Sequence, residues 1–250
     1  MATSKFKNGN LYIVIYSVVM VVIVAVLLSV TAMSLQGRQN ANVLNEKKIA
    51  ILQSLGKVEN GVATVDYDQF VEAFAVDGNG NVIEGLGQDE VINLLFDLKG
   101  AIENETYPVF KSADGRFVFP VTGQGLWDVI WGYVALEADL NTISGVVLDH
   151  KGETPGLGAE IATLKHQSMY QGKKIFEGAE FVSVKLVKGG AKNPVHEVDA
   201  ITGGTKTSDG VTAMIYDCLK NYLPYIAAET SVPEPAEEET TDAGEELSNE

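Results

Sequence analysis

The feature that most constrains this chain is an unbroken apolar stretch over residues 11–35, which reads LYIVIYSVVMVVIVAVLLSVTAMSL. No charged residue occurs between Lys7 and Arg38. A transmembrane helix needs about 20 predominantly apolar residues, whereas the apolar core of a signal peptide has about 7–15. A cleaved signal is the alternative, because residues 31–34 (Thr-Ala-Met-Ser) offer small side chains. The length favours one N-terminal transmembrane helix over residues 11–35.

Charge is distributed unevenly on the two sides of this stretch. Lys5 and Lys7 precede it and only Arg38 follows closely, which favours a short cytoplasmic N-terminus, residues 1–10. The whole chain carries a net charge of -16; because residues 1–38 contribute +3, the remainder carries -19. Nucleic acid is recognised by clustered basic charge, so this excess of carboxylates argues against a nucleic-acid partner.

The remainder divides into three segments. Residues 36–56 predict an amphipathic linker helix that ends near Gly56. Residues 57–228 have the length of one globular domain. Residues 229–250 contain nine acidic residues, no basic residue and two prolines, and we expect them to form a disordered acidic tail.

Apolar runs and turn residues within 57–228 predict one α+β domain, with a mixed sheet and flanking helices. The helix expected over residues 159–170 would bury Ile161, Leu164 and Met169. The single cysteine, Cys218, lies in the last expected helix and is interpreted as a core residue; no Cys/His spacing indicates a metal site. Strands are expected over residues 63–67, 73–76, 82–83, 109–111, 117–121, 131–136, 143–148 and 181–187, and helices over 89–98, 159–170 and 207–222.

The segment Asp-Ala-Ile-Thr-Gly-Gly-Thr-Lys-Thr-Ser, residues 199–208, precedes the last expected helix. Glycines let backbone amides approach an anion, and the first turn of a helix offers free N–H groups, so this segment could hold a phosphate. The alternative is an ordinary turn in which Thr207 and Ser208 cap the helix. Local chemistry alone leaves both interpretations open.

A second glycine-rich segment, residues 150–161, reads HKGETPGLGAEI and lies between an expected strand and an expected helix. It has neither the spacing of a P-loop nor that of a dinucleotide-binding fingerprint. Taken alone, it is ordinary turn chemistry, in which His150 and Glu153 would be solvated loop residues.

Together, the two segments resemble the signatures of the FMN-binding domain family. In that family an Asp precedes a Ser/Thr-Gly-Ala-Thr run, and the last threonine carries FMN through a phosphoester bond. The resemblance implies covalent FMN on Thr205, with Asp199 recognised by a flavin transferase that uses FAD as the FMN donor and Mg²⁺. Gly204 departs from the family pattern, which has alanine there.

The resemblance extends to one branch of this family, the C subunits of bacterial Na⁺-translocating NADH:quinone reductases. Residues 38–42, 125–133 and 136–141 (RQNAN, GLWDVIWGY and LEADLN) carry it, so it covers most of the chain except the tail. It implies an electron-carrying subunit in the bacterial inner membrane, with the FMN domain on the periplasmic side and other membrane subunits as partners. The alternatives are the G subunit of an Rnf electron-transfer complex and a membrane-anchored binding module without redox function.

The resemblance also suggests which residues surround the flavin, while implying no catalytic side chain. Trp127 and Trp131 are interpreted as core anchors rather than stacking partners. Lys188 could add positive charge near the flavin, although a solvated lysine is the simpler interpretation. The residues implied to bind the cofactor are Thr205, Thr154, Gly156, Leu157, Thr202, Gly203, Gly204 and Lys188.

Overall fold

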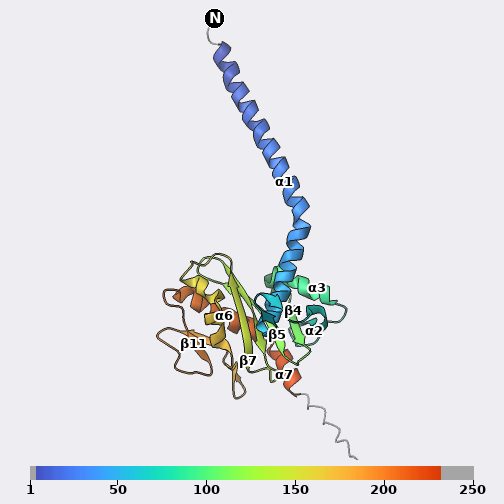
Figure 1. The fold of residues 1–250 in the computed structure, drawn as a ribbon, viewed down its shortest axis with the longest axis vertical. Coiled ribbons are helices and arrows are strands. Elements are labelled where there is room, and N and C mark those ends of the chain that lie inside the picture. The colour runs from blue at the N-terminus through green and yellow to red at the C-terminus, as the bar shows by residue number, and fades with distance from the viewer. Residues whose placement is uncertain (1–3, 232–250) are drawn as a thin grey trace, which may run out of the picture.

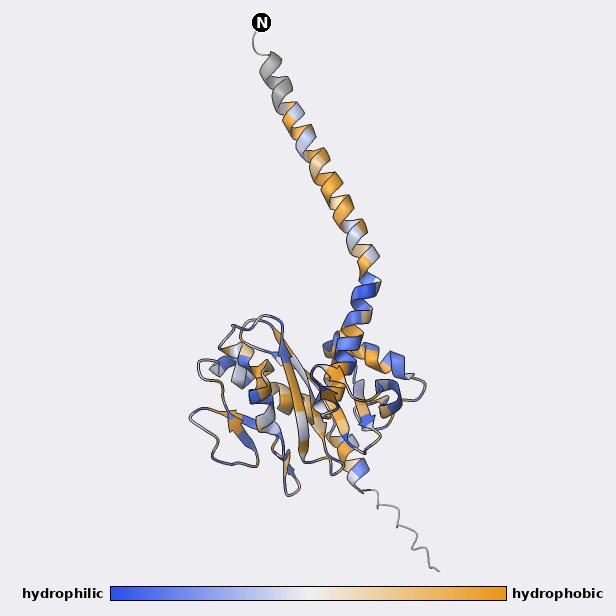
Figure 2. Cartoon of the chain, viewed as in Figure 1, coloured by the Kyte–Doolittle hydropathy of each residue, from blue (hydrophilic) through white to orange (hydrophobic). Residues whose placement is uncertain are grey.

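The computed structural model describes residues 4–231, and it consists of one long helix that leads into an α+β domain. Helix α1 (Ser4–Ser54) continues without a break from the apolar stretch to the domain (Figure 1). Figure 2 shows the apolar colouring of its upper part and the polar residues near the domain. This helix is long and apolar enough to cross a membrane, and none of its most apolar window is buried.

The domain is built on a five-stranded antiparallel sheet with the strand order β3-β4-β5-β6-β7. Three two-stranded sheets lie apart from it; β10 and β11 pair in parallel, whereas the other two pairs are antiparallel. The predicted α+β class is confirmed. Parallel and antiparallel pairs occur in separate sheets rather than in one mixed sheet. The strands are β1 (Val58–Glu59), β2 (Val62–Ala63), β3 (Val71–Val76), β4 (Tyr107–Ser112), β5 (Phe117–Gln124), β6 (Val129–Leu136), β7 (Ile143–His150), β8 (Phe176–Glu177), β9 (Glu180–Phe181), β10 (Lys185–Val187) and β11 (Glu197–Asp199).

Each face of the five-stranded sheet carries its own apolar core, because side chains alternate between faces along a strand. Phe119 and Val134 belong to the core that packs against α6 and α7, whereas Val118 and Tyr133 belong to the core beneath the end of α1 and helix α3. Cys218 is buried in the first of these cores. The remaining helices are α2 (Tyr67–Phe70), α3 (Gln88–Asn93), η1 (Leu94–Asp97), α4 (Leu98–Glu103), η2 (Gly158–Ala162), α5 (Leu164–Gln167), η3 (Ser168–Tyr170), α6 (Thr205–Asn221) and α7 (Leu223–Ser231).

The continuous helix predicted over residues 159–170 is wrong. The segment forms three short helical pieces, η2, α5 and η3, interrupted at Thr163, whose backbone is extended and whose hydroxyl caps the next turn by accepting from His166 N. This break rotates the following turn, so that Leu164 is 73% exposed while His166 and Gln167 are buried.

Three predicted strands also differ from the structure. The strand predicted over residues 82–83 is only an isolated bridge between Val82 and Val76, because the chain turns at residues 84–85. The strand predicted over residues 63–67 ends at Ala63, because Asp66 caps helix α2. The strand predicted over 181–187 divides into β9 and β10 at Ser183, which has a left-handed backbone with φ of 59°. At the C-terminus α7 extends to Ser231, so the first residues of the predicted tail are helical. The rest of that tail lies outside the described residues.

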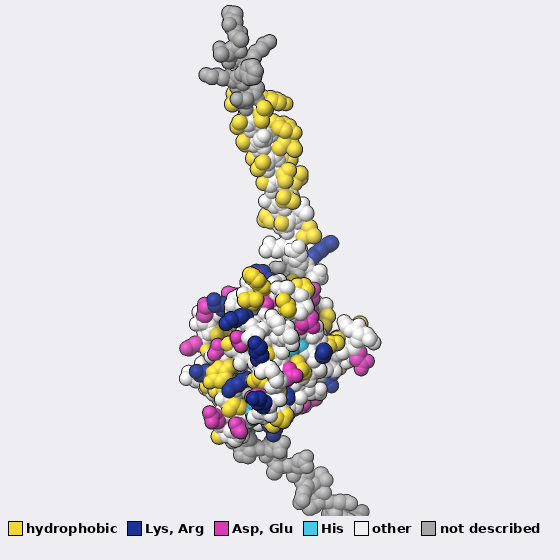
Figure 3. Space-filling model, turned by 90° about the vertical axis from the view of Figure 1, so that its left-hand side faces the viewer, with side chains coloured by type: hydrophobic (Ala, Val, Ile, Leu, Met, Phe, Trp, Pro, Cys, Tyr) yellow, Lys and Arg dark blue, Asp and Glu magenta, His cyan; other side chains and the backbone are white. Residues whose placement is uncertain are grey.

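The contacts of α1 define the orientation of the domain. The carbonyl oxygen of Ser54 lies against Gly145, near the start of β7. Lys47 lies about two turns earlier in α1 and lines the same cavity as Val129 and Trp131, at the start of β6. The β5–β6 hairpin and the loop after β7 therefore lie at the end of the domain from which α1 leaves (Figure 1). Charged side chains of both signs cover the face shown in Figure 3, in contrast to the apolar surface of α1 above it.

Candidate functional site

The two glycine-rich segments of the sequence meet in the structure. A side chain at Gly203 would collide with Leu157, and the position that a Cβ of Gly204 would occupy lies 3.4 Å from the backbone nitrogen of Gly158. Gly158 is also pressed against Glu153 and Thr207, which leaves no room for a side chain. The loop after β7 and the loop before α6 therefore form one packed unit.

A buried carboxylate, that of Glu153, lies at the centre of this unit. The side chain is only 4% exposed and accepts hydrogen bonds from the backbone nitrogen of Trp127 at 3.0 Å and from the Thr207 hydroxyl at 2.5 Å. Burial alone would raise the pKa of this carboxyl, but the hydrogen bonds from Thr207 and from backbone amides of the β5–β6 hairpin outweigh it and hold the pKa below its ordinary value. The interpretation of Glu153 as a solvated loop residue is wrong.

Helix α6 begins at Thr205, two residues earlier than predicted, with Gly204 at the N-cap. Thr207 and Ser208 consequently do not cap the helix with their side chains; both are buried in its first turn, where the Ser208 hydroxyl donates to Gly204 O and accepts from Ile201 N. Thr205 is exposed, and no other group within residues 4–231 hydrogen-bonds its hydroxyl. The Thr205 hydroxyl is thus free to react, next to the unpaired N–H groups of a helix start.

An exposed tryptophan extends the site beyond the two loops. Trp127, at the tip of the β5–β6 hairpin, is 67% exposed, and its indole nitrogen donates to the Thr154 hydroxyl at 3.2 Å. The prediction that Trp127 is a core anchor is wrong, because a hairpin tip has no layer above it to cover a side chain. Sequence reasoning missed it as a site residue; its place in the GLWDVIWGY block was the available signal. Trp131 is half-buried on the sheet.

The other residues implied by the resemblance lie around this centre. Gly156 and Thr202 are exposed, one in each loop, and Leu157 is 42% exposed beside Gly203. Asp199 ends β11 and accepts from Ala191 N at 2.7 Å. Lys188 is exposed and follows β10, where the hydrogen bond from Ala200 N to Val187 O places it beside the chain that leads to Thr205. Lys188 and Asp199 therefore adjoin the packed unit rather than forming part of it.

The fold and the site define an FMN-binding domain: the family model described as FMN-binding domain matches residues 125–220, a range that contains all of the site residues named above. The C subunit of the Na(+)-translocating NADH-quinone reductase of Vibrio anguillarum is 31% identical over 208 residues, covering 75% of this chain and 81% of that protein. The protein of the same name from Neisseria meningitidis is 40% identical over 114 residues, covering 45% of this chain and 44% of that protein. The chain belongs to the family of C subunits of Na(+)-translocating NADH-quinone reductases.

Solved structures of the same family resemble the domain. The crystal structure of the C subunit from Parabacteroides distasonis has a TM-score of 0.69 at 38% identity and covers 77% of this chain and 96% of that one. The crystal structure of NqrC from Shewanella oneidensis has a TM-score of 0.60 at 27% identity and covers 75% of this chain and 99% of that one.

Proposed function

We propose that this chain is the electron-carrying subunit, with covalently bound FMN, of a membrane complex that oxidises NADH, reduces quinone and exports Na⁺. The observation that carries the proposal is the exposed, unbonded hydroxyl of Thr205 at the start of α6, packed beside the loop that contains Thr154 and Leu157. Family membership supports the role in the complex.

The residues present fit FMN. Thr205 would be the attachment point: its hydroxyl oxygen forms a bond to the phosphorus of the FMN half of FAD, AMP leaves, and the hydroxyl proton is lost. This transfer is assigned to a flavin transferase with Mg²⁺ that recognises the segment from Asp199 to Thr205. The N–H groups of the first turn of α6 and the positive end of its dipole would stabilise the phosphate.

The ring of the cofactor requires an apolar surface with a few polar groups. Leu157 and Trp127 offer exposed apolar and aromatic surface, and the Thr154 hydroxyl between them offers a hydrogen bond. FMN, when bound, supplies the acceptance and release of electrons, while the protein determines its position and tunes its potential. The side chains of this chain therefore bind and orient the cofactor.

The proposed location is the bacterial inner membrane. A single helix, α1, is long and apolar enough to cross a bilayer within residues 4–231. The positive residues before the apolar stretch favour a cytoplasmic N-terminus, which would leave the FMN domain on the periplasmic side.

The proposal is tested by co-expressing the full chain with an active flavin transferase and measuring intact mass, tryptic peptides and flavin fluorescence in a denaturing gel. The expected result is one FMN adduct, added with loss of one water, on the peptide that contains Thr205. Thr205→Val should abolish it, whereas Thr64→Val, a control at an exposed threonine outside the segment that the transferase recognises, should retain it. Flavin that survives denaturation on the Thr205→Val chain would show the assignment to be wrong.

A further inference from the structure

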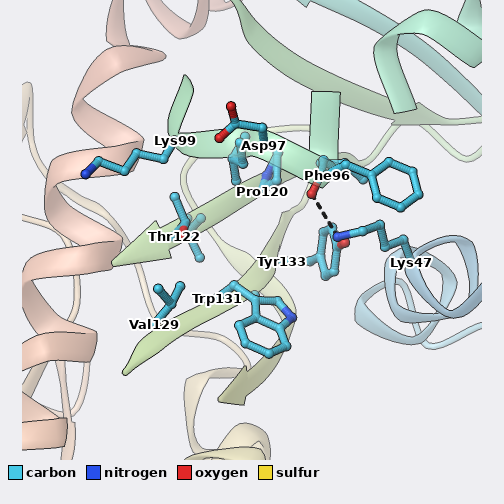
Figure 4. A pocket seen from close by; sticks show the side chains of 13 residues that line it. Lys47, Phe96, Asp97, Lys99, Pro120, Thr122, Val129, Trp131 and Tyr133 are labelled. Atoms are coloured by element: carbon cyan, nitrogen blue, oxygen red, sulfur yellow. Dashed lines mark hydrogen bonds between the residues drawn. The ribbon is translucent and has the colours of Figure 1, made fainter. Parts of the chain in front are cut away.

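A groove lies on the sheet face that packs beneath α1 and α3. It adjoins the loop after β7, because Lys151 N donates to Val129 O. We call this loop, which contains Thr154, and the loop before α6, which leads to Thr205, the flavin loops. The end of α1, η1 and the start of α4 cover only part of this face and leave a cavity of about 440 Å³ above the end of β5 and the start of β6. Figure 4 shows the side chains that line it. We define the sheet-face groove by its floor, Pro120, Thr122, Val129 and Trp131, and by its rim, Phe96 and Lys99. Phe96 is 46% exposed and Val129 is 39% exposed, so apolar surface is open to solvent here.

The groove faces the side of the domain that is anchored in the bilayer. Lys47 of α1 lines it, donating to the carbonyl oxygen of Leu95 at 2.8 Å with its ammonium 5.6 Å from the centre of the Phe96 ring (Figure 4). Lys47 lies twelve residues after Leu35, the end of the apolar stretch, which is about 18 Å along the helix axis. A protein segment that projects from the bilayer can reach this height, whereas lipid acyl chains cannot.

The charge around the groove complements an acidic partner. Lys47 and Lys99 flank the apolar floor with only Asp97 among the lining residues of opposite sign, although the chain as a whole has a net charge of -16. Lys99 is largely exposed, and its contact with Glu103 is long, at 3.8 Å. A segment with an apolar side chain for the floor and a carboxylate for Lys99 therefore fits the groove. A second copy of this strongly acidic chain would be repelled.

We propose that the sheet-face groove docks a loop of a membrane-embedded partner subunit, one that carries apolar side chains and at least one carboxylate. Val129 begins β6, two residues after Trp127 at the hairpin tip. A partner seated in the groove therefore lies beside the flavin loops, where electrons would pass. This inference rests on the proposed function, because it takes the membrane complex as the partner.

The experiment replaces Phe96 with the photoreactive residue benzoylphenylalanine in the full chain, expressed with its complex, and irradiates native membranes. The same residue at Leu164, which is 73% exposed and outside the groove, is the matched control. The expected result is a crosslink, at position 96 only, to a peptide of another complex subunit that lies outside its transmembrane segments and contains Asp or Glu. A crosslink to a second copy of this chain, or none at position 96, would overturn the proposal.

A charge substitution provides an independent measurement. Phe96→Asp should lower recovery of this subunit with the detergent-solubilised complex at least tenfold, whereas Leu164→Asp should not change it. Flavin fluorescence in a denaturing gel is measured on the same samples. If Phe96→Asp carries flavin normally and is recovered with the complex as well as the unsubstituted chain, the docking proposal alone is wrong. If the unsubstituted chain itself carries no flavin, the proposed function is wrong.

Discussion

The Thr207 hydroxyl donates a 2.5 Å hydrogen bond to Oε2 of Glu153, across 54 residues of sequence. Oε1 of the same carboxylate accepts from the backbone of Trp127, so one buried side chain holds three segments together: the β5–β6 hairpin, the loop after β7 and the first turn of α6. A carboxylate can accept several bonds at once without a proton of its own, which suits a site where only N–H and O–H donors converge.

Removing either member of this pair should destabilise the domain. A hydrogen bond to a buried charged group contributes about 1.5–3 kcal/mol, so Thr207→Val should lower the melting temperature by about 3–12 °C. Glu153→Gln should have an effect of similar size, because the NH2 group of its amide would replace one of the two acceptor oxygens, which face Trp127 N and the Thr207 hydroxyl. Thermal unfolding of both variants and of the double variant should reveal coupling, whereas Thr202→Val should remain within about 0.5 kcal/mol of the parent. Strict additivity would show that the bond does not stabilise the fold.

Glu153 should also make stability depend on acidity. Because its pKa is lower in the folded protein than the ordinary 4.5, its contribution is complete above that value and is lost as pH falls from there through the lowered pKa. The difference in melting temperature between the parent and Glu153→Gln should therefore be constant from about pH 6 to 8 and should shrink below about pH 4.5. A difference that instead grows on acidification would contradict the direction of the pKa shift.

Much of the sheet follows from the sequence, because β5, β6 and β7 are apolar runs separated by clear turns. Residues 159–170 show why other elements could not be predicted from the sequence. Ile161, Leu164 and Met169 have helical spacing, but the break at Thr163 depends on a local side-chain cap that periodicity does not register. Strands β9 and β10 are separate because Ser183 between them has a left-handed backbone, and β10 pairs with β11, which lies 12 residues later in the sequence.

The candidate site likewise has parts that the sequence predicts and parts that it does not. The two loops were located because their motifs are specific, and the structure brings them together. The burial of Glu153 was missed because its donors come from Trp127, which is 26 residues away, and from Thr207, which is farther still. No local pattern around Glu153 indicates either contact.

Trp127 should influence the bound flavin directly. If its indole lies against the ring, Trp127→Ala should raise the fluorescence of the native flavoprotein and shift its visible absorption, while Trp127→Phe should have a smaller effect because an aromatic face remains. Attachment of FMN, judged by intact mass, should be unaffected in both variants. Trp131→Phe is the control, since Trp131 lies on the sheet face rather than at the hairpin tip. Identical spectra for Trp127→Ala and the parent would place the ring elsewhere.

Gly204→Ala restores the residue found in the family pattern and should leave flavin attachment intact. The backbone at this position has φ of -108° and ψ of 35°, which accepts a side chain, but the new Cβ would lie 2.9 Å from Cγ2 of Ile201. Ile201 must therefore move by a few tenths of an ångström, and we expect a loss of about 1 kcal/mol, or about 2–4 °C in melting temperature. Intact mass reports attachment and thermal unfolding reports the strain. Loss of the adduct in Gly204→Ala would contradict this expectation. It would mean that, in this chain, Ile201 requires glycine at position 204 to keep Thr205 in the position that is modified.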